Sequence, residues 1–347
     1  MATLTHTAYV SRKIIKFGGV GILGLVIFYW LIGVAWNAYI AAHPSYIAPT
    51  VRFGILPKII FSQKDIKKDR TFTTELPNDS FPKFKDQANV YVIYRSKSVI
   101  GALEEAKKTA GLIGFSSQPG EMGTGIYEFN DNLSNRKLTM NVLADSFKLT
   151  YNYLGDQTLL NPENLPDKTE AVSLAKAFLS AAGKLYKDLD EGTTVVTYWK
   201  IDFGVLSEVK GLNDANIIRV DFLRKQLDDD KLIISEVPDK SSVSVLLSGS
   251  SVAAKKIVEV NYKYINVDES APSTYPIKTP QVAFADMKNG YYWPANDVSA
   301  SSVVIRKVSL AYFEPITPVQ FLQPVYVFEG DGGFVGYVPA VTDKYTQ

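Results

Sequence analysis

The side chains that most often carry enzyme chemistry are scarce in this chain. It has no cysteine, and its two histidines, His6 and His43, both lie near the N-terminus. There is therefore no thiol nucleophile, disulfide or thiolate metal site. Beyond residue 70 there is no histidine for a Ser-His-Asp triad or a typical zinc site. A serine paired with a lysine is the remaining route to nucleophilic catalysis.

Neither Ser-Lys pairs nor paired carboxylates form a convincing catalytic pattern. The Ser-x-x-Lys spacing occurs four times, but its usual Ser-Asp-Asn and Lys-Thr-Gly companions are missing. Carboxylates that cleave sugars must face each other across a cleft, whereas the acids here cluster along the sequence as on solvated faces. We therefore expect no enzymatic activity, no cofactor and no metal site. The Ser-Lys pairs are Ser80/Lys83, Ser134/Lys137, Ser173/Lys176 and Ser207/Lys210, and the clustered acids are Glu104, Glu105, Asp188, Asp190 and Glu191.

Length and composition indicate a folded protein of more than one part. The chain has 347 residues, of which 46% are hydrophobic and 12% aromatic, so it can bury substantial cores. Its formal net charge of +1 argues against nucleic acid as a partner. The acids at 228–230 do not match a calcium-binding loop and are typical of a solvated turn.

An uncharged run at residues 17–42 predicts a transmembrane helix. About 20 apolar residues are enough to cross the hydrocarbon core of a bilayer as a helix. The run carries aromatic residues suited to the headgroup region, namely Tyr29, Trp30, Trp36 and Tyr39. A buried core helix and a cleaved signal peptide are the alternatives. The run is longer than the 7–15 apolar residues of a typical signal peptide and lacks a cleavage pattern.

The charges that flank this run predict its orientation. Arg12, Lys13 and Lys16 precede the run, and only Arg52 and Lys58 follow it before residue 62. The excess of cations on the N-terminal side favours a cytoplasmic tail at residues 1–16 and a C-terminal bulk outside the cytoplasm. Residues 43–86, which contain several prolines near their start, predict an extended neck and linker. The expected location is the cell membrane, with one span.

The remaining sequence predicts an α+β fold of three units that each place a helix before antiparallel strands. These units are residues 87–160, 161–270 and 271–347. Their helices are expected near 98–110, 167–186 and 280–289. Their strands are expected at 88–94, 125–130, 137–143 and 146–153 in the first unit, at 193–203, 217–227, 242–247 and 257–267 in the second, and at 303–313, 321–328 and 334–339 in the third.

Two of these helices have clear start signals. Asp167 and Glu170 have the spacing of a capping box. Thr279 is a good N-cap, Pro280 suits the first helical position, and Gly290 can end the helix. The Pro-rich segment 271–280, which ends at this helix start, is interpreted as a linker that opens the third unit.

In the third unit, a short helix ending in Lys288-Asn289-Gly290 precedes VVIRKVSLAYFEP, FLQPVYVFEG and FVGYVPAV. This succession resembles the C-terminal end of the YycH/YycI family of membrane-anchored regulators, and PepSY-type modules more broadly. Pro324, Val325 and Tyr326 occupy the Pro-Val-aromatic stretch of that family, and Leu310, Tyr312 and Phe313 resemble its preceding strand. The detailed match covers residues 279–340. The anchor and the earlier units agree only in outline, and the middle unit is larger than a plain PepSY module.

This resemblance implies repeated PepSY-like units and a regulator that acts by contact on a membrane-bound histidine kinase or an extracellular peptidase. The expected function is a non-enzymatic interaction or regulatory protein. The alternatives are a structural subunit of a cell-envelope assembly (secretion, pilus or surface layer) and an envelope glycan-binding module. Aromatic residues are the candidate partner surface, because Tyr and Trp often anchor interfaces. They are Tyr291, Tyr292 and Trp293 first, then Phe313 and Phe321 with the neighbouring Pro315 and Pro318. The first three have an alternative role, which is to cover the end of the third unit's sheet.

Overall fold

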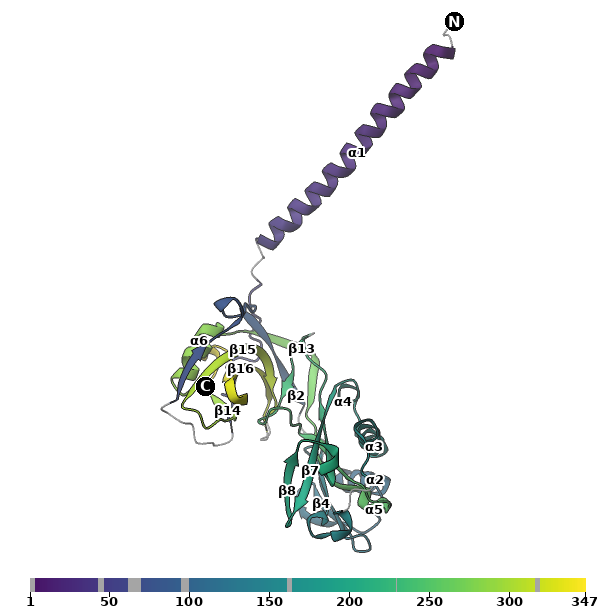
Figure 1. Ribbon diagram of the computed structural model, residues 1–347, viewed down its shortest axis with the longest axis vertical. Coiled ribbons are helices and arrows are strands. Elements are labelled where there is room, and N and C mark those ends of the chain that lie inside the picture. The colour runs from purple at the N-terminus through teal and green to yellow at the C-terminus, as the bar shows by residue number, and fades with distance from the viewer. Residues whose placement is uncertain are drawn as a thin grey trace. The chain divides into compact units, whose positions relative to one another are not determined.

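The chain divides into two compact units, Met1–Ala48 and Pro49–Gln347. The computed structural model describes residues 4–42, 47–61, 70–94, 100–160, 164–228, 230–315 and 319–347. The fold is a mixed α+β fold with one N-terminal apolar helix and two large sheets (Figure 1). We refer to residues 49–347 as the body.

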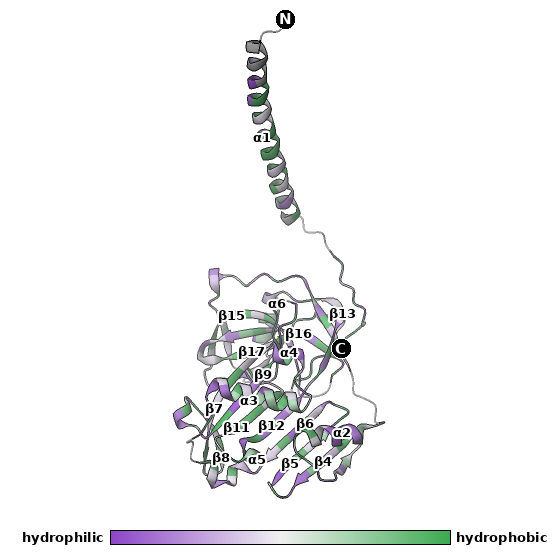
Figure 2. Ribbon diagram, turned by 90° about the vertical axis from the view of Figure 1, so that its right-hand side faces the viewer, coloured by the Kyte–Doolittle hydropathy of each residue, from purple (hydrophilic) through white to green (hydrophobic). Residues whose placement is uncertain are grey.

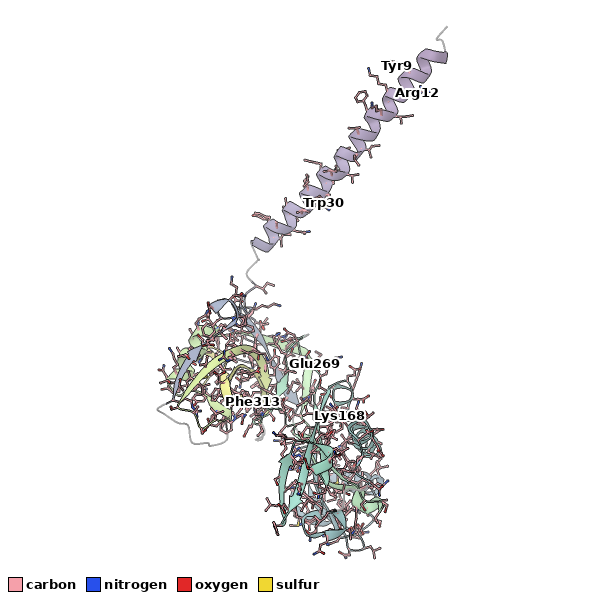
Figure 3. The ribbon with its side chains drawn as sticks, viewed as in Figure 1. Tyr9, Arg12, Trp30, Lys168, Glu269 and Phe313 are labelled. Carbon is pink, nitrogen blue, oxygen red and sulfur yellow. The ribbon has the colours of Figure 1, made fainter. Side chains whose placement is uncertain are left out.

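The first unit consists of one long helix, α1 (Leu4–Ala42). Within it, Arg12–Ile40 is long and apolar enough to cross a membrane, and the apolar side chains are exposed rather than packed in the structure. Figure 2 shows hydrophobic residues along much of α1. Among its exposed aromatic side chains are those expected at a membrane interface: Tyr29, Trp30, Trp36 and Tyr39 (Trp30 is labelled in Figure 3). The helix begins well before the uncharged run because residues 4–16 contain neither proline nor glycine to stop it.

A nine-stranded antiparallel sheet contains most of residues 120–263. Its order is β3-β4-β5-β6-β12-β11-β9-β7-β8. The central pairing of β6 with β12 places Phe147 opposite Tyr262, and their rings stack 4.9 Å apart. The strands are β3 (Gly120–Gly123), β4 (Ile126–Asp131), β5 (Arg136–Asn141), β6 (Ser146–Tyr151), β7 (Thr193–Asp202), β8 (Val205–Val209), β9 (Ile217–Leu223), β11 (Val243–Ser248) and β12 (Ile257–Lys263).

Two helices, α2 (Ala102–Leu112) and α3 (Lys168–Ala181), contribute to the main hydrophobic core of this sheet. Their small buried residues, such as Ala106 and Ala175, let the helix backbones approach the strands closely. Asp167 caps α3 by accepting the Glu170 backbone N–H at 2.8 Å, as its spacing predicts. The helix ends at Ala181 instead of continuing to 186, because Gly183 takes a positive φ. Two single-turn helices, α4 (Lys187–Asp190) and α5 (Ala253–Lys256), complete this part.

The eight-stranded sheet is built around the C-terminal strands β15 and β16. Its main order is β1-β15-β16-β17-β14, with β10 on β15 and β2 on both β13 and β16. The helix α6 (Pro280–Lys288) contacts β17. The Thr279 hydroxyl accepts the Val282 N–H at the start of α6, as expected of an N-cap. The strands are β1 (Thr71–Thr74), β2 (Gln87–Tyr94), β10 (Ile233–Ile234), β13 (Asn266–Pro276), β14 (Trp293–Asn296), β15 (Ser302–Phe313), β16 (Phe321–Gly330) and β17 (Val335–Pro339).

Three expectations about chain organisation differ from this arrangement. The strands assigned to the first two predicted units join one sheet through β6 and β12, while β2 leaves the first unit to pair with β13 and β16. Residues 271–276 are not a linker but the second half of β13, which bulges between Asp268 and Ser273. The predicted neck is partly folded, because β1 pairs in parallel with β15 and Leu56 exchanges backbone hydrogen bonds with the C-terminal segment. The first two predicted units therefore share one sheet, and β2 belongs with the strands of the third.

Candidate interaction surfaces

The hairpin between β7 and β8 presents a fully exposed aromatic side chain. Asp202 pairs with Val205, which leaves Phe203 and Gly204 as a two-residue turn. Their φ angles are 47° and 75°, and positive φ at both central residues is the signature of a type I′ turn. Glycine and asparagine tolerate this backbone region, whereas a bulky side chain is strained in it. Phe203 is 100% exposed, so no burial of its ring compensates for the strain.

Strand β8, which follows this turn, is an edge of the nine-stranded sheet. Within the described ranges, no strand pairs with its outer side. Val205, at its start, is largely exposed, and the rest of the strand is exposed at Ser207 and Glu208 and half-buried at Leu206 and Val209. An open edge with apolar side chains can add a strand from another chain, because its backbone N–H and C=O groups are available. Reasoning from the sequence missed this surface. The clue in the sequence is the Phe203-Gly204 pair, a possible two-residue turn between the strand-like runs 193–202 and 205–209.

The first predicted aromatic site is mostly buried. Tyr291 is exposed at 72%, but Tyr292 and Trp293 retain only 5% and 3% of their accessible surface. Trp293 stacks on Phe61 at 5.6 Å and donates its indole N–H to the Glu236 carbonyl at 3.2 Å. Trp293 also begins strand β14 instead of lying in a loop. The prediction that Tyr292 and Trp293 form a partner surface is therefore wrong, because both side chains are buried. Their burial agrees better with the alternative role of packing against the sheet.

The second predicted aromatic site is also largely internal. Phe313 is buried on β15, with its ring 4.9 Å from that of Phe61 (Phe313 is labelled in Figure 3). Phe321 is half-buried and stacks on Phe53 at 5.2 Å. Both line a hollow of about 240 Å³ together with Pro315. Pro318 lies outside the described residues. Phe313 is thus a core residue, and only the partly exposed Phe321 could contribute to a surface.

A polar cleft of about 600 Å³ lies where the two sheets meet. Strand β2 of the eight-stranded sheet contributes Tyr91, and the loop that follows β9 contributes residues 224–228. The segment at the start of β7 supplies residues 191–193, while Glu269 comes from β13 (labelled in Figure 3). Lys225 and Glu191 are paired at 2.7 Å. The cleft can hold a polar or charged group but has few apolar walls.

Asp228 connects the two sides of this cleft. It takes a left-handed backbone conformation with φ 49°, which aspartate tolerates better than most residues. Its carboxylate accepts the Asn89 amide at 2.8 Å and the hydroxyls of Tyr91 and Tyr312. Burial, followed by the hydrogen bond to Asp228, raises the pKa of Tyr312 well above its usual range. Three donors on one carboxylate indicate a structural role for Asp228.

A second charged cluster, which includes the cleft-lining Arg224, joins the two sheets. Arg224 bonds to Asp188 at 2.6 Å and to the Ile265 carbonyl at 2.9 Å. Glu314, at the end of β15, is buried and accepts the Ser242 hydroxyl at 2.5 Å. Burial raises the pKa of Glu314, although the nearby positive charge of Arg224 opposes that shift. The cluster ties β15 to the loops of the nine-stranded sheet.

Most of the clustered acids and two of the paired lysines, Lys137 and Lys176, sit in ordinary ion pairs. Lys176, the lysine of the Ser-Lys pair on α3, bonds to Asp190 at 2.7 Å. Three of the other clustered acids also have cationic partners: Glu104 pairs with Lys107, Asp188 with Arg224, and Glu191 with both Lys187 and Lys225. Among the described residues, no three His, Asp or Glu side chains gather to hold a metal ion. These groups do not converge on one reaction centre.

Comparisons with known proteins show remote likenesses only. A scan against models of protein families found no match, and a search of curated proteins found none either. Among solved structures, an uncharacterized protein from Eubacterium rectale is 12% identical with a TM-score of 0.41, over 79% of this chain and 88% of that one. The Bacillus megaterium YpeB C-terminal domain is 12% identical with a TM-score of 0.32, over 72% of this chain and 95% of that one. Scores this low support no argument about fold or function.

Proposed function

We propose that this protein is a single-pass membrane protein whose body binds a partner protein and performs no chemistry of its own. The apolar helix α1 supports the membrane anchor. The cations before the anchor, Arg12, Lys13 and Lys16, outnumber those just after it and favour a cytoplasmic N-terminus with the body outside. The scarcity of histidine and cysteine supports a role that depends on contact.

One observation carries the binding half of this proposal, namely the β7–β8 hairpin. Phe203 is fully exposed, and its backbone lies in a region where phenylalanine costs stability. Strain of this kind concentrates at functional sites, and aromatic side chains are among the strongest anchors of protein interfaces. The adjoining edge strand β8 offers backbone hydrogen bonds to the same partner. Phe203 would fill an apolar pocket on the partner.

The resemblance of residues 279–340 to the YycH/YycI family and to PepSY-type modules suggests the class of partner. It favours a membrane-bound sensor kinase or an extracellular peptidase. A structural subunit of an envelope assembly is the alternative, because an open edge strand could also join repeated copies. Glycan binding is less favoured, because Tyr292 and Trp293 are buried and only Tyr291 of that group remains exposed.

In-membrane photo-cross-linking tests this proposal. A photoreactive phenylalanine analogue replaces Phe203 in the full chain, and captured proteins are identified by mass spectrometry. The control carries the analogue at Leu133, which is equally exposed at the β4–β5 turn. Capture of a kinase or peptidase from position 203 but not 133 supports the regulatory function. Capture of the chain itself or of one envelope machine in fixed stoichiometry supports the structural alternative.

Two outcomes would overturn the proposal. Equal capture from positions 203 and 133 would mean that the hairpin is not a binding site. Hydrolase activity of the purified chain that disappears on changing a single serine or glutamate would mean that the protein is an enzyme.

A further inference from the structure

The start of the body has an unusual surface for a soluble fold. Residues 47–61 contain two cations, Arg52 and Lys58, and no acidic residue. Both cations are exposed, and so are the apolar side chains of Ile55 and Ile60. We call these four residues the neck surface.

The neck surface rests on rigid structure. Leu56, between its members, is buried and exchanges backbone hydrogen bonds with the C-terminal segment, accepting from Gln347 and donating to Tyr345. The Arg52 N–H bonds to the Ser273 hydroxyl at 2.8 Å, which ties the segment to β13. A backbone held at these points leaves Ile55 and Ile60 exposed, while Leu56 is buried and Phe53 and Ile59 pack partly against the core.

Neighbouring residues extend the surface. Lys58 lines a hollow of about 570 Å³ together with the exposed Tyr291, a residue type suited to membrane interfaces. That hollow also contains Asp286 and Asp343, which both bond to Lys278 at 2.9 Å, so one cation faces two carboxylates there. With Arg52 and Lys58 included, three cations face two carboxylates, and these five groups keep one net positive charge.

We propose that the neck surface binds the headgroup region of an anionic bilayer. The inference rests on the proposed function, in which α1 spans a membrane. Residues 43–48 connect α1 to the body, and six residues reach at most about 20 Å. This short connection would keep the neck near the lipid surface. Exposed isoleucines beside cations match that surface, because apolar groups enter the interface while Arg and Lys attract anionic lipids.

The absence of cysteine makes a direct test possible in the full chain. Single cysteines at positions 55 and 60 would carry an environment-sensitive fluorophore in proteoliposomes made with or without phosphatidylglycerol. Matched labels at Leu133, exposed on a distant turn, and at Gly24, within α1, serve as controls. We expect the labels at 55 and 60 to be quenched by headgroup-labelled nitroxide lipids and shielded from aqueous iodide, more so with phosphatidylglycerol. The label at 133 should remain open to iodide.

Charge variants complete the test. Arg52→Gln and Lys58→Gln should each lower the ratio of membrane-bound to free neck about fivefold in vesicles with phosphatidylglycerol. This is the effect of losing one cation near an anionic surface. Arg52→Lys should retain binding. Labels at 55 and 60 that are as open to iodide as the label at 133 would overturn the inference. A label at 24 that escapes quenching by tail-labelled lipids would instead show that the anchor itself is wrong.

Discussion

Replacing Phe203 by asparagine should make the protein more stable and, under the proposed function, less able to bind a partner. The substitution creates Asn-Gly, the preferred pair for a type I′ turn. A residue other than glycine costs about 1–2 kcal/mol in the left-handed region, and asparagine recovers a large part of this cost. Phe203 is fully exposed, so no buried contact is lost. We therefore expect a gain of about 1 kcal/mol in the free energy of unfolding, or roughly 2 °C in melting temperature.

Urea unfolding of the full chain in mild detergent can measure this gain. Trp199 on β7 and the buried Trp293 on β14 provide fluorescence signals from the two sheets. The midpoint should rise while the slope with urea stays constant, because the exposed area changes little. Leu133→Asn is the matched control, since Leu133 is equally exposed but does not have a positive φ. It should change stability by less than about 0.5 kcal/mol.

A second variant separates strain from binding. Phe203→Ala removes the ring but keeps a non-glycine residue in the same turn, so its stability should match that of the parent while its partner cross-linking is lost. A Phe203→Asn variant that is no more stable than the parent, or is less stable, would refute the argument. Such a result would mean that the turn is not strained or that the ring packs against the body.

Three further predictions concern the junction of the two sheets. Asp228→Ala should cost about 3–5 kcal/mol, because the hydroxyls of Tyr91 and Tyr312 and one amide lose their acceptor; Asp228→Asn, which keeps one acceptor oxygen, should cost clearly less, and equal urea midpoints for the two variants would contradict this role. The pKa of Glu314 is raised by burial, so the folded state holds its proton more tightly and stability falls as pH rises from about 4.5 through the folded pKa. Glu314→Gln should flatten this pH dependence in melting curves, and an unchanged slope would show that Glu314 does not titrate in this range. Gly192→Ala should disrupt the start of β7, because a Cβ there would lie 2.0 Å from a backbone oxygen, and a hydrogen-exchange pattern identical to that of the parent would rule out this packing.

Local features of the fold were predictable because their causes lie within a few residues. The ends of α6 follow from Thr279, Pro280 and Gly290, which cap, start and stop a helix through their own backbone preferences. The alternation of Phe147 and Leu149 predicted β6 with its buried face. Such signals do not depend on distant parts of the chain.

Strand partners were not predictable in the same way. The pairing of β6 with β12 joins residues more than 100 positions apart, and nothing in either strand's alternation identifies the other. Residues 271–276 contain two prolines and so predicted a linker, yet residues 273–276 pair in regular register with β2 at the end of β13. Pro272 lies in the bulge between Asp268 and Ser273 and Pro276 is the last residue of the strand, which are places where a sheet tolerates proline, and only the surrounding sheet could decide this.

The candidate sites likewise include features that the sequence determines and features that only tertiary packing decides. Inventory alone determined that the body has no cysteine or histidine, and the uncharged run alone determined a helix long enough to cross a membrane, because both depend on residue types and not on their positions in space. Exposure depended on the tertiary structure. Trp293 and Phe203 are both aromatic residues near strand ends, yet packing buries the first and leaves the second fully exposed. The physical reason is that burial is decided by what folds against a residue, and for Trp293 that is Phe61, more than 200 positions earlier in the chain.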